Sequence, residues 1–118
     1  MPSVSVRRGQ PVRLLLDGSL PPDGYPNSEA PLAVRIRAGE RTIHQSTRSG
    51  APFPIEVDLP AESFPEGEWR VEMSYAYCLA GQRSLCVPAH ELWWVTVHFS
   101  DHGESEIHLT ANASAIRG

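Results

Sequence analysis

Hydrophobic and polar residues alternate along most of this chain, which is the pattern of β-strands buried on one face. The longest alternating run is 69–77, in which the apolar positions are Trp69, Val71, Met73, Tyr75 and Tyr77. A second long run covers 93–99, and shorter runs cover 3–7, 12–17, 34–37, 42–45, 55–59 and 107–109. No stretch of helical period is longer than one turn, so we expect seven to nine short strands.

Proline and glycine separate these runs. The chain has 11 prolines and 9 glycines in 118 residues, scattered as turn residues rather than gathered into a repeat. The segment 17–31, DGSLPPDGYPNSEAP, cannot form a helix and is expected to be a long structured loop. The sequence therefore predicts an all-β, antiparallel, immunoglobulin-like β-sandwich. We expect one domain over residues 1–110 and a flexible tail over 111–118.

Charge and hydropathy exclude two classes of partner. The formal net charge is −4, and the ten basic residues are all arginines spread along the chain, so no basic stripe for nucleic acid is expected. No apolar run approaches the roughly 20 residues of a membrane span. The first residues lack the apolar core of a signal peptide, which predicts a cytoplasmic protein if the chain is complete. Otherwise, upstream sequence sets the localisation.

The two cysteines, Cys78 and Cys86, flank the loop LAGQRSL between the two longest runs. A hairpin would bring them within disulfide distance if they fall in register. Their spacing is too wide for a thioredoxin CxxC motif or for a zinc pair, and His90 offers only a third ligand. We therefore expect no metal and no cofactor. A static disulfide, two free buried thiols and a redox pair with a thiolate stabilised by Arg83 or His90 all stay open.

Aromatic and histidine residues give further candidates. Trp93 and Trp94 are adjacent on one strand and must face opposite sides, so one belongs to the core and the other to a covered or exposed surface. His98, His102 and His108 surround one turn, and the first and last would face each other if their strands paired. Their spacing matches no known metal motif, which favours a polar hairpin end exposed to water.

Two short motifs carry a resemblance to a known family. The segment SVRRGQPVRLLLDGSLPPDGYPNSEAP resembles the opening of the C-terminal β-domain of proteins that join a thioredoxin-like domain to an NHL-repeat β-propeller. The matching positions are Gly9, Leu14, Leu20, Pro21, Gly24, Asn27, Ala30 and Pro31, with Pro22-Asp23 as an insertion. Tyr77, Cys78, Leu85 and Cys86 match a later motif of the same family. The chain is more distantly similar to the periplasmic N-terminal domain of the transmembrane thiol:disulfide interchange protein, whose two cysteines are closer in sequence.

The resemblance implies a non-catalytic accessory or interaction module of a larger protein, not an enzyme on its own. Its expected partners are thioredoxin-like and β-propeller domains of the same or another chain. One alternative is a thiol–disulfide exchange domain that uses Cys78 and Cys86 with a thioredoxin-fold partner. Another is a sandwich that binds a small ligand or carbohydrate through exposed aromatic side chains. The candidate binding residues are Tyr77, Arg83, His90 and Trp94.

Overall fold

The computed structural model describes residues 3–27, 29–49, 53–80 and 85–110, and these form β-strands and connections with no helix. The strands are β1 (Ser3–Arg7), β2 (Val12–Asp17), β3 (Gly24–Pro26), β4 (Pro31–Ala38), β5 (Arg41–Ser49), β6 (Ile55–Leu59), β7 (Gly67–Leu79), β8 (Cys86–Ser100) and β9 (Glu106–Thr110). Eight of the nine correspond to the alternating runs of the sequence. The exception is β3, which lies inside the proline-rich loop.

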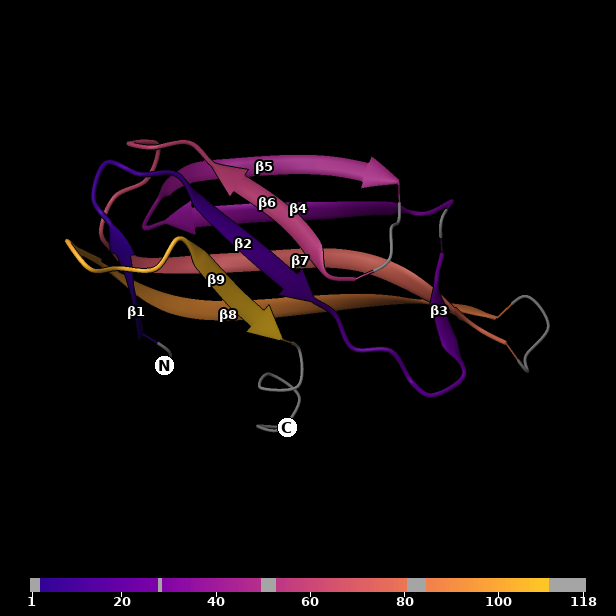
Figure 1. Cartoon of the computed structure of the whole chain (residues 1–118). Helices are drawn as coiled ribbons and strands as arrows, with labels where there is room; N and C mark the ends of the chain where they lie inside the picture. The colour runs from indigo at the N-terminus through magenta and orange to yellow at the C-terminus, as the bar shows by residue number, and fades with distance from the viewer. Residues whose placement is uncertain (1–2, 28, 50–52, 81–84, 111–118) are drawn as a thin grey trace.

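The strands form two facing sheets (Figure 1). The larger sheet has the order β1-β8-β7-β4-β5, and β3 also pairs with β7; the smaller sheet has the order β6-β2-β9. The predicted all-β sandwich is therefore confirmed. Most pairs are antiparallel, but β1–β8 and β2–β9 are parallel. These pairs are parallel because the connection from β1 to β2 and the connection from β8 to β9 both lead from the larger sheet to the smaller one. The two connections run side by side and in the same direction.

These two crossings pack closely at one end of the sandwich. The Glu104 N–H donates to the Ser5 carbonyl at 2.8 Å, and the Arg7 Nε donates to the Gly103 carbonyl at 3.2 Å. A β-carbon on Gly103 would overlap the backbone of Val6. Only glycine fits this contact without a shift of the backbone.

The core consists of the inward-facing positions of both sheets, as the alternation predicts. Trp69 is fully buried, donates its indole N–H to the Pro65 carbonyl at 3.0 Å, and meets the Phe64 ring edge-on at 5.5 Å. Trp93 is also buried, whereas Trp94 lies on the outer face of the larger sheet with 43% exposure. The two indoles therefore face opposite sides, as expected.

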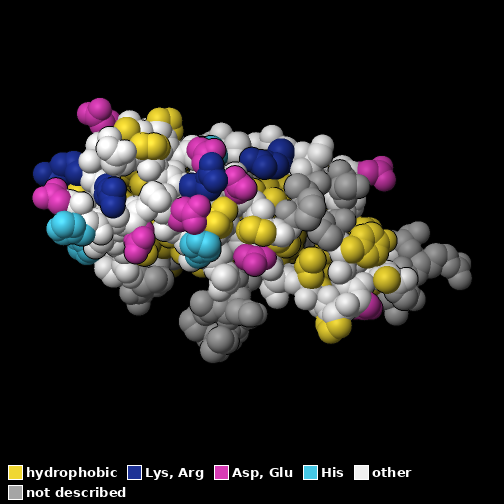
Figure 2. Space-filling view, in the orientation of Figure 1, with side chains coloured by type: hydrophobic (Ala, Val, Ile, Leu, Met, Phe, Trp, Pro, Cys, Tyr) yellow, Lys and Arg dark blue, Asp and Glu magenta, His cyan; other side chains and the backbone are white. Residues whose placement is uncertain are grey.

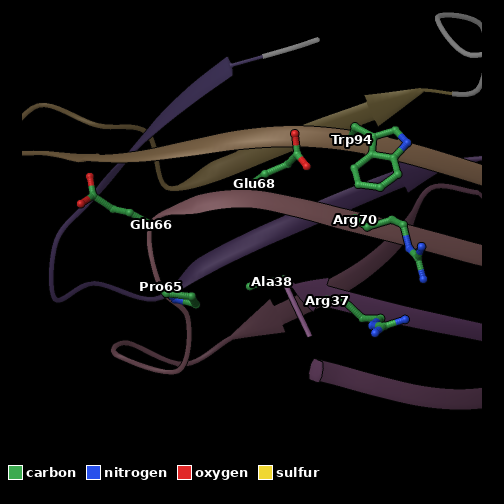
Figure 3. A pocket seen from close by; sticks show the side chains of 8 residues that line it. Arg37, Ala38, Pro65, Glu66, Glu68, Arg70 and Trp94 are labelled. Carbon is green, nitrogen blue, oxygen red and sulfur yellow. The ribbon is translucent and has the colours of Figure 1, made fainter. Parts of the chain in front are cut away.

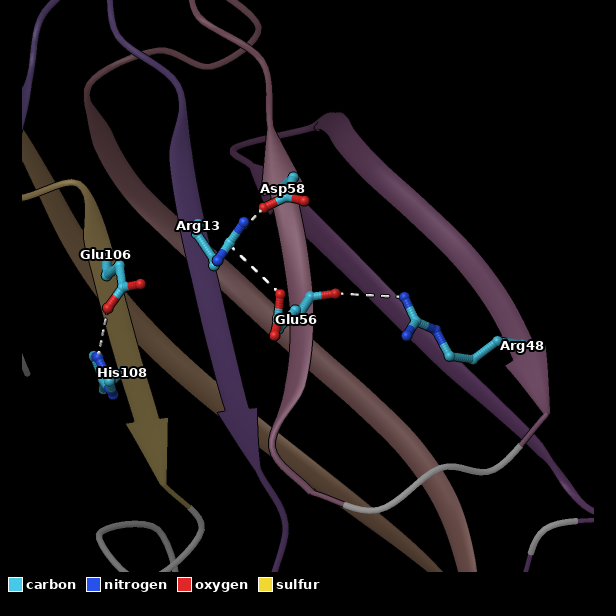
Figure 4. A network of polar contacts seen from close by, with 6 residues as sticks. All are labelled: Arg13, Arg48, Glu56, Asp58, Glu106 and His108. Atoms are coloured by element: carbon cyan, nitrogen blue, oxygen red, sulfur yellow. Dashed lines mark hydrogen bonds and ion pairs between the residues drawn. The ribbon is translucent and has the colours of Figure 1, made fainter.

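The outer face of the smaller sheet carries charged pairs (Figure 4). Arg13 Nε lies 2.9 Å from Asp58 Oδ1 and 3.6 Å from Glu56 Oε1, and these contacts, led by the hydrogen bond to Asp58, raise the pKa of Arg13. His108 and Glu106 pair at 3.3 Å on the neighbouring strand. All of these groups are exposed, so they contribute little stability. Figure 2 shows acidic and basic side chains intermixed on this side, and apolar side chains toward the other end of the molecule.

That other end is a projecting arm. The β7–β8 hairpin keeps one register from Gly67–Val97 to Cys78–Cys86 and extends past the end of the smaller sheet (Figure 1). Near its tip, β3 pairs with residues 77–79 of β7. We call β3 together with residues 77–79 and 85–87 the arm. The molecule is consequently elongated, with principal extents of 51, 27 and 24 Å.

Candidate functional site

The arm contains the disulfide. Cys78 and Cys86 are register partners on β7 and β8, and their sulfur atoms are bonded, with Cα atoms 3.9 Å apart. The Leu79 N–H donates to the Leu85 carbonyl at 3.0 Å, which makes 79–85 a hydrogen-bonded pair of the ladder. Because such pairs alternate along antiparallel strands, Cys78–Cys86 is a non-hydrogen-bonded pair, in which side chains come closest. Two of the three alternatives left by the sequence therefore remain: a static disulfide and a redox pair.

The two cysteines differ in their surroundings. Cys78 lies in the middle strand of the arm, between β3 and β8, and is only 7% exposed. Cys86 is exposed on β8. Within the described part of the chain, the far edge of β8 pairs only with β1, from Thr96 to Ser100. A protein that approaches the disulfide therefore meets Cys86 first.

Tyr25, on β3, is a side-chain neighbour of Cys78. It is the register partner of Cys78 and is 51% exposed. Backbone bonds hold its strand at both ends, because Ala80 N–H donates to the Asp23 carbonyl at 2.8 Å and Asn27 N–H donates to the Ala76 carbonyl at 3.0 Å. Tyr25 gives no signal in the sequence, since it stands in a loop without alternation.

Gly24 and Asn27 shape this loop. Gly24 N–H donates to the Pro21 carbonyl at 2.9 Å, and a β-carbon on Gly24 would lie 2.7 Å from Pro21 Cδ. The Asn27 side chain accepts from the Glu29 N–H at 3.0 Å, an Asx-type turn. These positions therefore have a local structural role, which is to bring β3 against β7 beside the disulfide.

Tyr75 packs at the base of the arm and holds it by hydrogen bonds. Its ring is buried and meets Phe53 edge-on at 5.1 Å, and its hydroxyl lies 2.7 Å from Glu91 Oε2 and 3.1 Å from both the N–H and the carbonyl of Ser19. Burial first, and then the hydrogen bond to Glu91, raise the pKa of Tyr75 far above its ordinary value. Tyr77, the tyrosine selected from the sequence, is partly buried against the core, on the face of β7 opposite Cys78.

His90 does not lie at the disulfide. It is four residues from Cys86 on an extended strand, or about 13 Å. Its Nδ1 lies 3.1 Å from the Ser74 hydroxyl, and its Nε2 lies 3.9 Å from Glu72 Oε2. The expectation that His90 stabilises a cysteine thiolate is therefore corrected: it is held beside Ser74 and Glu72 instead. Arg83, the other candidate, lies outside the described residues.

The histidine cluster also separates. His98 is on β8 and His108 is on β9, and these strands belong to different sheets, so the two rings do not face each other across a ladder. In the described ranges, no three histidine, cysteine or acidic side chains are grouped so that they could hold a metal ion.

Comparison of the sequence with protein families and with curated proteins gives no relative. No model of a protein family matches this sequence, and no curated protein matches it. The ranges that the structure describes contain no helix that is long and apolar enough to cross a bilayer. The function must therefore be argued from the geometry of the sandwich and its arm.

Proposed function

We propose that this chain is a non-catalytic β-sandwich module of a larger protein with thioredoxin-like and NHL-repeat domains, and that its arm binds a thioredoxin-fold domain. The observation that carries the proposal is a pair of exposed apolar side chains beside the disulfide. Tyr25, at 51% exposure, is the register partner of Cys78 and shares its face of the arm, whereas Leu85, at 43%, precedes Cys86 and lies on the opposite face. Large apolar side chains that are exposed on both faces of a projecting element are typical of protein contact sites.

The construction of the arm favours binding. The disulfide and the ladder bonds of β3 hold the strands in one arrangement before any partner arrives. A preformed surface loses less conformational entropy on association, so more of the contact energy goes into affinity. The family resemblance supports a thioredoxin-fold domain as the partner.

The test uses oxidised thioredoxin as the probe, because it has no free dithiol and so reports binding without exchange. We expect NMR shift changes in the isotope-labelled domain to be confined to the arm, and a Tyr25→Ala/Leu85→Ala variant to lose them. Leu92→Ala is the matched control, since Leu92 is also exposed, at 38%, but lies outside the arm. Shift changes that persist in the double variant, or that vanish equally in the control, would refute the proposal.

A second function, thiol–disulfide exchange, is favoured by the unequal exposure of the cysteines. A thiolate of a reduced thioredoxin-fold partner would attack the Cys86 sulfur, and Cys78 would leave as a thiolate and take up a proton. The second thiolate of the partner would then attack its own mixed disulfide and release Cys86. Two electrons pass from the partner dithiol to the Cys78–Cys86 disulfide.

The reduction potential of the Cys78–Cys86 pair separates the two functions. It is measured by equilibrating the domain in glutathione and dithiothreitol redox buffers and quantifying the free thiols. A potential below about −300 mV indicates a structural disulfide. A potential near that of thioredoxin, about −270 mV, together with fast exchange, indicates an exchanger.

A further inference from the structure

A cleft lies on the outer face of the larger sheet, away from the arm. It has a volume of about 390 Å³, within the usual size of small-molecule sites. Trp94, Arg70 and Arg37 lie at one side of it, Pro65 and Glu66 lie at the other, and Glu68 lies between (Figure 3). Three strands, β4, β7 and β8, supply most of this lining.

The two arginines of the cleft differ in their polar partners. Arg37 and Arg70 are direct register partners on β4 and β7, an arrangement of like charges that destabilises a sheet. Arg70 is compensated, since its Nε lies 3.0 Å from Glu72 Oε1. Arg37 is not: its Nε is buried and has no hydrogen-bond partner among the described residues. Arg37 also lines the cleft, so its guanidinium is the donor that we expect an anionic group there to contact.

The other side chains that line the cleft favour a ligand that has further groups besides an anionic one. Trp94 is 43% exposed and presents an indole, with the Arg70 guanidinium 5.8 Å from the ring centroid. Glu68 and Glu66 supply carboxylate acceptors, and Glu66 is held by the Phe99 N–H at 2.7 Å. These carboxylates disfavour a ligand that is anionic throughout, such as a nucleic acid, and favour one that carries hydroxyl donors.

We propose that this cleft binds a uronate, a sugar ring that carries one carboxylate. The carboxylate accepts from the guanidinium groups of Arg37 and Arg70, one apolar face of the ring lies on Trp94, and the hydroxyls donate to Glu68. A neutral sugar leaves Arg37 without its acceptor, and a simple carboxylate leaves the indole uncovered. The uronate therefore satisfies groups that each of those ligands leaves unsatisfied.

The experiment titrates the domain with D-glucuronate and follows both tryptophan fluorescence and calorimetric heat. We expect saturable binding with a dissociation constant of about 1 mM for a ligand of this size. Arg37→Gln and Trp94→Ala are expected to weaken binding about tenfold or more, and Trp94→Phe to keep the heat but lose the fluorescence change. Arg41→Gln is the control, because Arg41 is an exposed arginine at the same hairpin but does not line the cleft.

The ligand controls are glucose, which lacks the carboxylate, and acetate, which lacks the ring. Both are expected to bind about tenfold more weakly than glucuronate or worse. No saturation with glucuronate up to about 50 mM, roughly fifty times the expected constant, overturns the proposal. Equal affinity for acetate or glucose, or equal losses in Arg41→Gln and Arg37→Gln, also overturns it. Far-UV circular dichroism of each variant confirms that a loss of binding is not a loss of fold.

Discussion

Removal of the disulfide tests whether the arm folds together with the sandwich. The change is Cys78→Ala with Cys86→Ala, which cuts a cross-link between residues 8 apart in sequence. On the chain-entropy model, a loop this short gives roughly 2.5 kcal/mol by restricting the unfolded chain. We therefore expect the free energy of unfolding, measured by urea denaturation, to fall by about that amount. The same value corresponds to a lowering of the reduction potential by about 50 mV relative to the unfolded chain.

The full loss of stability requires that the arm unfold in one cooperative transition with the sandwich. The β7–β8 ladder supports this, because its register continues without a break from the core pair Trp69–Val95 to the disulfide. Hydrogen exchange of the Leu79 amide, which bonds to Leu85 at the tip, provides the local readout. A loss well below 1 kcal/mol in urea, with fast exchange at Leu79 alone, would refute the reasoning, since the arm would then unfold separately.

Three further predictions concern single residues. Gly103→Ala should lower the free energy of unfolding by about 1 to 3 kcal/mol in urea, because its β-carbon would meet the Val6 backbone; wild-type stability would contradict this contact. Tyr75→Phe should cost about 1 to 3 kcal/mol in the same assay, since Ser19 and Glu91 lose their partner, and an unchanged midpoint would argue against that network. Because the pKa of Tyr75 is raised, its folded form keeps a proton that the unfolded chain loses. Its contribution to stability should be full below about pH 10 and fall as the pH rises further, and Tyr75→Phe should show a shallower alkaline loss in thermal melts.

The strands could be predicted because a strand that is buried on one face alternates apolar and polar residues with a period of two. The run 69–77 lies within β7, and four of its five apolar positions are buried, whereas the fifth, Tyr77, is partly buried. The strand β3 could not be predicted, since its three residues include a glycine and a proline and have no alternation. Backbone bonds to β7 make it a strand. The parallel pairs were also missed, because alternation reports which face a residue occupies and not the direction of the neighbouring strand.

The candidate site was predictable only in part for the same reason. The sequence placed Cys78 and Cys86 on neighbouring strands, but the choice between thiols and a disulfide depended on register, which composition does not encode. Tyr25 reaches the disulfide through a loop that folds back, and no local pattern indicates that return. Arg37 and Arg70 are outward-facing by alternation, but only the β4–β7 register sets them opposite each other.

The disulfide and the cleft lie on one face of the same strand and are nevertheless separate sites. Cys86 and Trp94 both have even positions on β8, so their side chains share the outer face of the larger sheet. Eight residues of extended strand separate them, or about 26 Å, which is well beyond the roughly 8 Å Debye length at physiological salt. Charge in one site is therefore screened from the other, and their coupling must pass through the β7–β8 ladder. That ladder keeps one register between the two sites, and the two proposals rest on different residues, so they are tested by independent observations.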